Sequence, residues 1–161
     1  MSTSKALNTP TGVTNHLSTF APYSEVEKLY MSHVPYASPV GSLMYVMVCT
    51  RPDIAYSVNV VNMFMSRPGK KHWQSVKRIF HYLRGTSDVG HIYGSNNQCI
   101  VIGYSNSDYA ADIDSRRSMT GYVYTLGDSV VSWKTTLQST VTLSTTEGEY
   151  MALTEAAKEG I

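Results

Sequence analysis

Apolar residues recur every three or four positions through the first half of the chain, a spacing typical of helices. The pattern predicts three helices, over 39–49, 52–66 and 70–84, and we expect a short helix over 25–31 before them. The helix over 39–49 is apolar on nearly every side, so we expect it to be buried against its neighbours. The helix over 52–66 carries one core-facing stripe formed by Ile54, Val58, Val61 and Met65.

The second half changes to β-branched runs and alternating positions, which are typical of strands. The run over 99–105 is largely apolar and favours a strand buried on both faces. Two further strands are expected over 118–126 and 129–134, joined by a glycine–aspartate turn. Good helix formers then predict a final helix over 147–159, with a serine or threonine cap before it.

Composition indicates the number of domains and the cellular compartment of the chain, but not its function. A length of 161 residues suits one domain, or a domain with a helical appendage. Cys49 and Cys99 lie far apart without a CxxC motif, which favours buried, reduced thiols in an intracellular protein, cytoplasmic or nuclear. We expect no secretory signal, because residues 1–20 lack a basic start followed by an apolar core. We expect no membrane span, because the longest apolar run, over 43–49, is too short. Residues 1–24 are polar and interrupted by prolines, so we expect a flexible leader.

The helix over 70–84 carries the clearest polar signal. From Arg67 to His91 the chain has six Lys or Arg residues against one acid, Asp88. Two interpretations stay open: a solvated helix face, which is what most charged runs are, or a basic surface that follows phosphates. The second interpretation assigns nucleic-acid binding to Lys70, Lys71, Lys77, Arg78, His81 and Arg84.

Several motifs carry a resemblance to a known family. The segment 103–124, which begins Gly-Tyr-Ser-Asn-Ser-Asp, resembles the first hairpin of the ribonuclease H domain in copia-type retrotransposon Pol polyproteins. Val-Ser-Trp-Lys at 131–134 and Ser-Thr-Thr-Glu-Gly-Glu-Tyr at 144–150 continue the resemblance. Thr-Arg-Pro-Asp-Ile-Ala at 50–55 and Tyr-Leu-Arg-Gly-Thr at 82–86 resemble the segment that follows the polymerase core.

The resemblance implies an α+β fold, in which an N-terminal helical segment precedes an incomplete ribonuclease H-like unit of a three-stranded antiparallel sheet and one helix. It divides the chain into a leader over 1–24, a segment like the reverse transcriptase thumb or connection over 25–88, and a truncated ribonuclease H-like domain over 89–161. In the complete fold the strand from Cys99 to Ser105 is central. We therefore expect an open edge here, with self-association through that strand or dependence on a partner.

The resemblance also implies a ribonuclease H site, in which four acidic residues bind two Mg²⁺ ions. The second acid corresponds to Glu149, whereas Asn106 stands at the position of the first, and the other two would lie beyond Ile161. Because asparagine has no charge, we expect no Mg²⁺ binding, or weak binding by Asp108 together with Glu149. In the same hairpin we expect a charged turn in which acids pair with arginines: Asp112, Asp114, Arg116 and Arg117.

These features leave three hypotheses for function. The first is a Pol-derived fragment without catalytic activity, which retains at most weak, non-specific binding to RNA–DNA hybrid or other nucleic acid. The second is a ribonuclease H-type hydrolase of RNA in RNA–DNA hybrids, whose missing acids come from another chain. The third is an interaction module with a role in a host. We expect the first, and we expect the chain alone not to be an enzyme.

Overall fold

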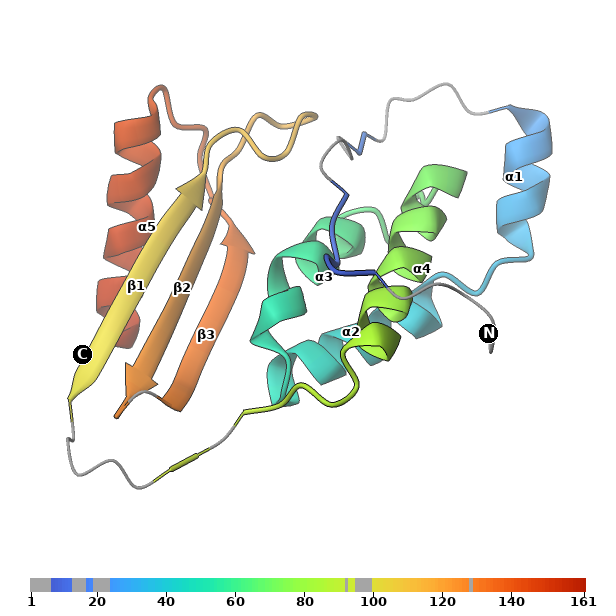
Figure 1. Cartoon of the computed structure of the whole chain (residues 1–161). Coiled ribbons are helices and arrows are strands. Elements are labelled where there is room, and N and C mark those ends of the chain that lie inside the picture. The colour runs from blue at the N-terminus through green and yellow to red at the C-terminus, as the bar shows by residue number, and fades with distance from the viewer. Residues whose placement is uncertain (1–6, 13–16, 19–23, 92, 95–99, 128) are drawn as a thin grey trace. The chain divides into compact units, whose positions relative to one another are not determined.

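The computed structural model describes residues 7–12, 17–18, 24–91, 93–94, 100–127 and 129–161. The chain divides into two compact units, 1–90 and 91–161. In the described residues the first unit is helical and the second combines a three-stranded sheet with one helix, so the fold class is α+β (Figure 1). No helix in those stretches is long and apolar enough to cross a membrane.

The first unit contains the four predicted helices, with one of them split. Its elements are α1 (Glu25–Ser32), α2 (Ala37–Cys49), the 3₁₀ helix η1 (Pro52–Ile54), α3 (Ala55–Asn62) and α4 (Lys70–Gly85). The helix expected over 52–66 is divided because Pro52 opens a tight 3₁₀ turn before α3 begins. The helix also ends before the predicted residue 66. After α3 the Phe64 N–H bonds to Val61 O, three residues back, which forms a turn tighter than an α-helix.

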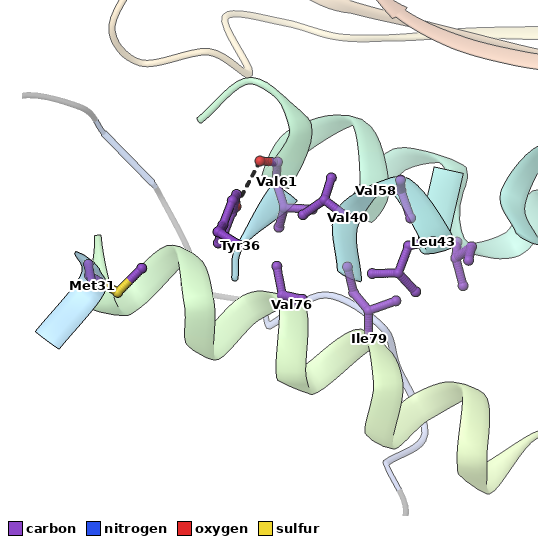
Figure 2. Close-up of a cluster of buried hydrophobic side chains, with 9 residues drawn as sticks. Met31, Tyr36, Val40, Leu43, Val58, Val61, Val76 and Ile79 are labelled. Atoms are coloured by element: carbon purple, nitrogen blue, oxygen red, sulfur yellow. Dashed lines mark hydrogen bonds between the residues drawn. The ribbon is translucent and has the colours of Figure 1, made fainter. Parts of the chain in front are cut away.

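Helices α2, α3 and α4 enclose the core of the first unit (Figure 2). Each contributes two side chains that are at most 1% exposed: Val40 and Leu43, Val58 and Val61, Val76 and Ile79. Tyr36 lies at one end of this core, and its hydroxyl donates to Val61 O at 2.8 Å. Burial raises the pKa of Tyr36 well above its ordinary value, so this phenol stays a neutral donor.

Three expectations about burial in this unit are wrong. Cys49, at the end of α2, is exposed, although a buried thiol was expected. Helix α2, which was expected to be buried on nearly every side, exposes Tyr45 to 73% and Val48 to 65%, because η1 and α3 contact its opposite side. In the stripe over 52–66 the first three members are buried as predicted, but Met65 is 38% exposed. Phe64, at 2% exposed, fills the core instead, because the tight turn after α3 breaks the helical spacing.

The second unit is an antiparallel sheet in the order β1-β2-β3, with one helix over one face. Its elements are β1 (Val101–Asp108), β2 (Met119–Leu126), β3 (Ser129–Leu137) and α5 (Thr145–Glu159). Tyr124 OH donates to Ala156 O at 2.6 Å, which ties β2 to α5. Burial, followed by the nearby Glu159 carboxylate, raises the pKa of Tyr122 to about 12.

The first strand departs most from its prediction. β1 runs from Val101 to Asp108 rather than over 99–105, and Cys99 lies outside the described residues. Every β1 residue except Ser107 is exposed, although a strand buried on both faces was expected. The reason is that β1 is an edge strand and α5 covers one of its faces, a position in the sheet that apolar composition does not reveal.

Helix α5 starts two residues before its predicted start, at Thr145. The Ser144 side chain caps it by accepting from Glu147 N–H at 3.1 Å, and Glu147 Oε2 accepts from Leu143 N–H at 2.7 Å. The first bond satisfies a donor in the first turn of the helix. The second joins Glu147 to the residue before the cap, one position earlier than in a capping box. Thr145 and Thr146, which the sequence also offers as caps, lie inside the first turn.

Candidate functional site

The cations predicted to bind nucleic acid lie on α4, and the start of this helix is firmly fixed. Gly69 N–H donates to His72 Nδ1 at 2.6 Å, and the His72 ring stacks on Phe64 with ring centroids 4.1 Å apart. His72 is 5% exposed, because it caps α4 from within the core. With Val76 and Ile79 buried, the opposite side of α4 faces outward.

Two lines of cations follow that outward side of α4. Spacings of seven, four and three residues align Lys70, Lys77, His81 and Arg84, and a spacing of seven aligns Lys71 with Arg78. The helix contains no acidic residue. Among the described residues, Lys71 and Lys77 have no ion-pair partner. An acid does reach the helix start, where Glu27 Oε1 accepts from Lys70 N–H at 2.7 Å.

Part of the predicted leader packs beside these cations. Arg78 Nη2 donates to Thr9 Oγ1 at 3.0 Å, and the Thr11 and Ser57 hydroxyls form a hydrogen bond. Leu17 is 7% exposed. The two described stretches of the leader, 7–12 and 17–18, are therefore packed rather than free. Little in their composition predicts this packing, because the stretches are polar and carry few apolar anchors.

An ion pair that sequence reasoning did not single out fixes the other end of α4. Arg51 is 7% exposed, and it donates through Nε and Nη2 to the two Asp53 carboxylate oxygens at 2.9 and 2.8 Å. Arg51 Nη1 also donates to Thr86 O at 3.0 Å, directly after α4. Tyr82 OH donates to Asp53 Oδ2 at 2.7 Å. The Arg51–Asp53 pair thus joins the α2–α3 junction to the end of the basic helix.

The pKa of Asp53 reflects this environment. Burial alone would raise it, but the hydrogen bonds from Arg51 and Tyr82, together with the Arg51 charge, outweigh burial and lower it below the usual value. The Asp53 carboxylate is therefore ionised wherever the chain is folded near neutral pH. Asp53 holds the charged Arg51 side chain close to the end of α4. Because its own charge is paired with Arg51, it adds no unpaired negative charge near the basic residues of that helix.

The second unit holds the positions that the resemblance assigns to catalysis. Asn106 and Asp108 lie at the end of β1, and Glu149 lies near the start of α5. Ser107, between the first two, faces α5, because a Cβ added at Gly148 would lie 3.0 Å from its Oγ. Strand alternation therefore directs Asn106 and Asp108 to the face of the sheet that α5 does not cover.

A buried polar cluster fixes the start of α5 against this end of the sheet. Gln138 is 4% exposed, and its Nε2 donates to Gly148 O at 2.9 Å and to Thr120 Oγ1 at 3.0 Å. Beside it the Ser118 and Thr142 hydroxyls lie 3.0 Å apart. Sequence reasoning missed this cluster, since Ser, Thr and Gln are usually exposed and nothing in their spacing marks them.

The described side chains do not fit a two-magnesium site. Asn106 brings no charge, Asp108 shares its sheet face, and Glu149 lies on the helix that covers the other face. In the part of the chain that the structure describes, no three His, Cys, Asp or Glu side chains are grouped so that they could hold a metal ion. The structure thus does not bring the three candidate residues into one ligand set.

The charged turn after β1 is built differently from its prediction. The Asp112 carboxylate accepts from Asp114 N–H at 3.2 Å, from Ser115 N–H at 3.3 Å and from the Ser115 hydroxyl. Arg117, an expected partner of the acids, donates to Ser115 Oγ at 3.0 Å. Aspartate favours bonds to the backbone two and three residues ahead, and these bonds replace the expected Asp112–arginine pair.

Comparison with known proteins supplies the family. The chain is 49% identical over 164 residues to the retrovirus-related Pol polyprotein from transposon TNT 1-94 of Nicotiana tabacum, of which it spans 12%. It is 40% identical over 124 residues to the retrovirus-related Pol polyprotein from transposon RE1 of Arabidopsis thaliana, of which it spans 8%. No protein-family model and no solved structure matches the chain.

One relative is covered almost entirely by this chain. Secreted RxLR effector protein 161 of Plasmopara viticola is 47% identical over 131 residues, which cover 81% of this chain and 92% of the effector. The similarity to Pol polyproteins runs through the whole chain and confirms the copia-type resemblance at the level of the family. The chain therefore belongs to the family that comprises this effector protein and the matching segment of retrovirus-related Pol polyproteins from copia-type transposons.

Proposed function

We propose that the chain is a Pol-derived module that binds the sugar–phosphate backbone of nucleic acid without sequence preference. The observation that carries the proposal is α4, a helix without acids whose outward side carries its cations. The binding residues are Lys70, Lys71, Lys77, Arg78, His81 and Arg84. Basic side chains aligned on a rigid helix can contact the regularly repeating phosphates of a nucleic-acid backbone. Such contacts do not depend on the base sequence.

The expected binding is weak. Lys77, Arg78 and His81 are half-buried, and Arg78 already donates to Thr9. The exposed cations of the surface are fewer: Lys70, Lys71 and Arg84. Neutralising about four phosphates gives a slope of log K against log salt of roughly −4 on duplex, and non-specific binding of this kind has a Kd of about 10⁻⁴ to 10⁻⁶ M at physiological salt.

The same proposal assigns the two units to parts of Pol. Residues 25–88 correspond to the thumb or connection region of the reverse transcriptase, and residues 89–161 to the N-terminal half of a ribonuclease H domain. The order of the helical and sheet units and the motifs at 50–55 and 103–124 support this assignment. The chain spans 12% and 8% of the two Pol polyproteins compared above, so the activities of those whole proteins do not pass to it directly.

We further infer that the chain alone does not hydrolyse RNA in an RNA–DNA hybrid. Two-metal hydrolysis needs several carboxylates that converge on the metal ions. Here Asn106 replaces the first acid, and Asp108 and Glu149 lie on different sides of the sheet. An enzyme completed by acids from another chain is the alternative, and it requires that chain to supply most of the ligands.

A host role is the second alternative, and one observation favours it. The relative of which this chain covers 92% carries the name of a secreted effector rather than of a Pol polyprotein. If the folded wild type shows no nucleic-acid binding in the test below, that result would favour this alternative over the first proposal.

The test compares two double variants that remove the same charge. Fluorescence anisotropy of a labelled duplex measures binding by the wild type, by Lys70→Ala/Lys77→Ala, and by a control, Lys28→Ala/Lys158→Ala. The control lysines are exposed and lie in helical ion pairs outside α4. We expect the α4 variant to lose roughly tenfold or more in affinity at low salt and the control to stay near wild type. Equal losses in both variants would show a general charge effect and contradict an α4 surface.

A further inference from the structure

Helix α1 lies at the margin of the first unit, outside the packed group of α2, α3 and α4 (Figure 1). Its Met31 side chain is buried, whereas Val26 and Leu29 are 78% and 66% exposed. An α-helix of eight residues is marginal by itself in water, because isolated helices need about 12 to 15 residues. The position of α1 therefore depends on its contacts with the rest of the unit.

Two contacts join α1 to the start of α4, and both involve Lys70. Glu27 Oε1 accepts from Lys70 N–H at 2.7 Å, and Lys70 Nζ lies 6.0 Å from the centre of the Tyr30 ring. Among the described residues Glu27 joins no ion pair, so its carboxylate is held by the Lys70 N–H rather than by a paired cation. Helix α1 thus occupies both the backbone donor and the ammonium group of one residue of the proposed nucleic-acid surface.

The start of α4 favours an anion, and α4 itself supplies none. The first N–H groups of a helix have no partner within the helix, and the helix dipole places partial positive charge there. The first turn of α4 contains no acid and instead carries Lys70 and Lys71. Glu27, which lies 43 residues before Lys70, supplies the negative charge from α1. A phosphate oxygen would satisfy the same N–H group, since the starts of helices bind both phosphates and carboxylates.

We propose that α1 is a latch on the nucleic-acid surface. In the free protein Glu27 occupies the start of α4, and a backbone phosphate replaces it when nucleic acid binds. That phosphate then accepts from Lys70 N–H, and the departure of Tyr30 frees the Lys70 ammonium group for a phosphate as well. The latch rests on the nucleic-acid binding proposed above for α4, and it weakens that binding because α1 must first be displaced.

A nucleic acid can displace a tethered carboxylate because it brings several phosphates at once. Glu27 contacts only the first residue of α4, and the other basic residues of the helix remain available for a first encounter. Once one phosphate is bound there, its neighbours in the same strand reach Lys70 at a high effective concentration. Inorganic phosphate has no such neighbours and should displace Glu27 poorly.

Two variants of α1 test the latch, and they remove the same charge from the same turn. Glu27→Ala removes the contact with α4, whereas Glu25→Ala is the control, because Glu25 pairs with Lys28 within α1. Without nucleic acid, nuclear magnetic resonance measures hydrogen exchange of the Lys70 amide. We expect exchange to be roughly two- to fivefold faster in Glu27→Ala than in Glu25→Ala. Equal exchange in the two variants would show that the contact does not hold in solution and would overturn the proposal.

Fluorescence anisotropy of one labelled duplex at low salt then measures the competition. We expect Glu27→Ala to bind roughly two- to fivefold more tightly than Glu25→Ala, because no carboxylate has to leave α4. Equal affinities of the two variants would overturn the latch and leave nucleic-acid binding by α4 in place. The absence of binding by the wild type and by both variants would instead contradict the proposed function, and the latch with it.

Hydrogen exchange followed by mass spectrometry tests the displacement of α1 itself. On binding of the duplex to the wild type, we expect exchange to become faster in α1 and slower in α4. A purely electrostatic effect of Glu27 would leave α1 in place and its exchange unchanged. Unchanged or slower exchange in α1 on binding would therefore overturn the proposal.

Discussion

Gln138 Nε2 donates to the backbone oxygen of Gly148 at 2.9 Å, and this bond joins the end of β3 to the start of α5. Gln138 is 4% exposed, and it directly follows the last residue of β3. Glu149, which the family resemblance aligns with the second acid of a ribonuclease H site, is the next residue after Gly148. The position of that carboxylate therefore depends on a buried amide that carries no charge.

We expect Gln138→Ala to lower the free energy of unfolding of the second unit by about 2 kcal/mol, since it removes buried hydrogen bonds and leaves a cavity. Ser139→Ala, at the exposed position next to Gln138, is the control and should change stability by less than about 0.5 kcal/mol. Urea unfolding followed by Trp133 fluorescence in a Trp73→Phe background measures the second unit. Equal effects of both variants would show that the Gln138 bonds contribute nothing.

The Arg51–Asp53 pair predicts a dependence of stability on pH. The folded-state pKa of Asp53 is lowered, so its contribution is present above the ordinary pKa of 3.8 and is lost as pH falls through the folded value. At pH 7 we expect Asp53→Asn to destabilise the first unit by about 1 to 3 kcal/mol, because the buried Arg51 loses a charged acceptor. Urea unfolding at pH 7 and near pH 3 should show the gap from wild type narrowing in acid. A gap independent of pH would contradict an ionised pair.

The cations of α4 should contribute unequally to nucleic-acid binding. Lys77 has no ion-pair partner among the described residues, whereas Arg78 already donates to Thr9. We expect Lys77→Ala to reduce the magnitude of the slope of log K against log salt by roughly 0.9, and Arg78→Ala to reduce it by less. Anisotropy titrations of one duplex at several salt concentrations measure both slopes. A larger effect of Arg78→Ala would show that Thr9 releases the guanidinium on binding.

Restoring the first acid should not restore hydrolysis. We expect Asn106→Asp to leave RNA in an RNA–DNA hybrid uncleaved with Mg²⁺ or Mn²⁺, because the described residues still lack a ligand set for two ions. Gel analysis of an end-labelled hybrid measures cleavage, with an active ribonuclease H as the positive control. Metal-dependent cleavage by Asn106→Asp but not by Asn106→Asp/Glu149→Ala would show that the two positions do converge.

Elements whose pattern is local were predictable from the sequence. The spacing of apolar residues located α4, and the serine and threonine run before Glu147 located the start of α5 within two residues. The exposure of β1 was not predictable from its composition, because an apolar strand looks the same in sequence at the centre and at an edge. Its place at an edge of the described sheet was expected only from the family resemblance. The sequence pattern also failed to predict that Phe64, rather than Met65, is buried in the core. A single tight turn after α3 breaks the helical spacing on which the prediction rested.

Of the candidate site, only the cluster of basic residues on α4 was predictable from the sequence. The six basic residues of α4 stand out by their number, and their spacing aligns them along the helix. The contacts that fix that helix are ordinary residues brought together from distant positions, such as Arg51 with Thr86 and Thr9 with Arg78. Periodicity carries no information about such pairs, because their separation in sequence follows from the packing of the whole unit.

The central claim, that this chain holds nucleic acid without cleaving it, is tested most directly on one labelled RNA–DNA hybrid. Binding and cleavage are followed in the same low-salt reaction with Mg²⁺, first by anisotropy and then by gel analysis of the recovered strand. We expect saturable binding that salt reverses, with the RNA strand intact at the end. Cleavage that requires Mg²⁺ and disappears in Glu149→Ala, or the absence of any binding at low salt, would contradict the account.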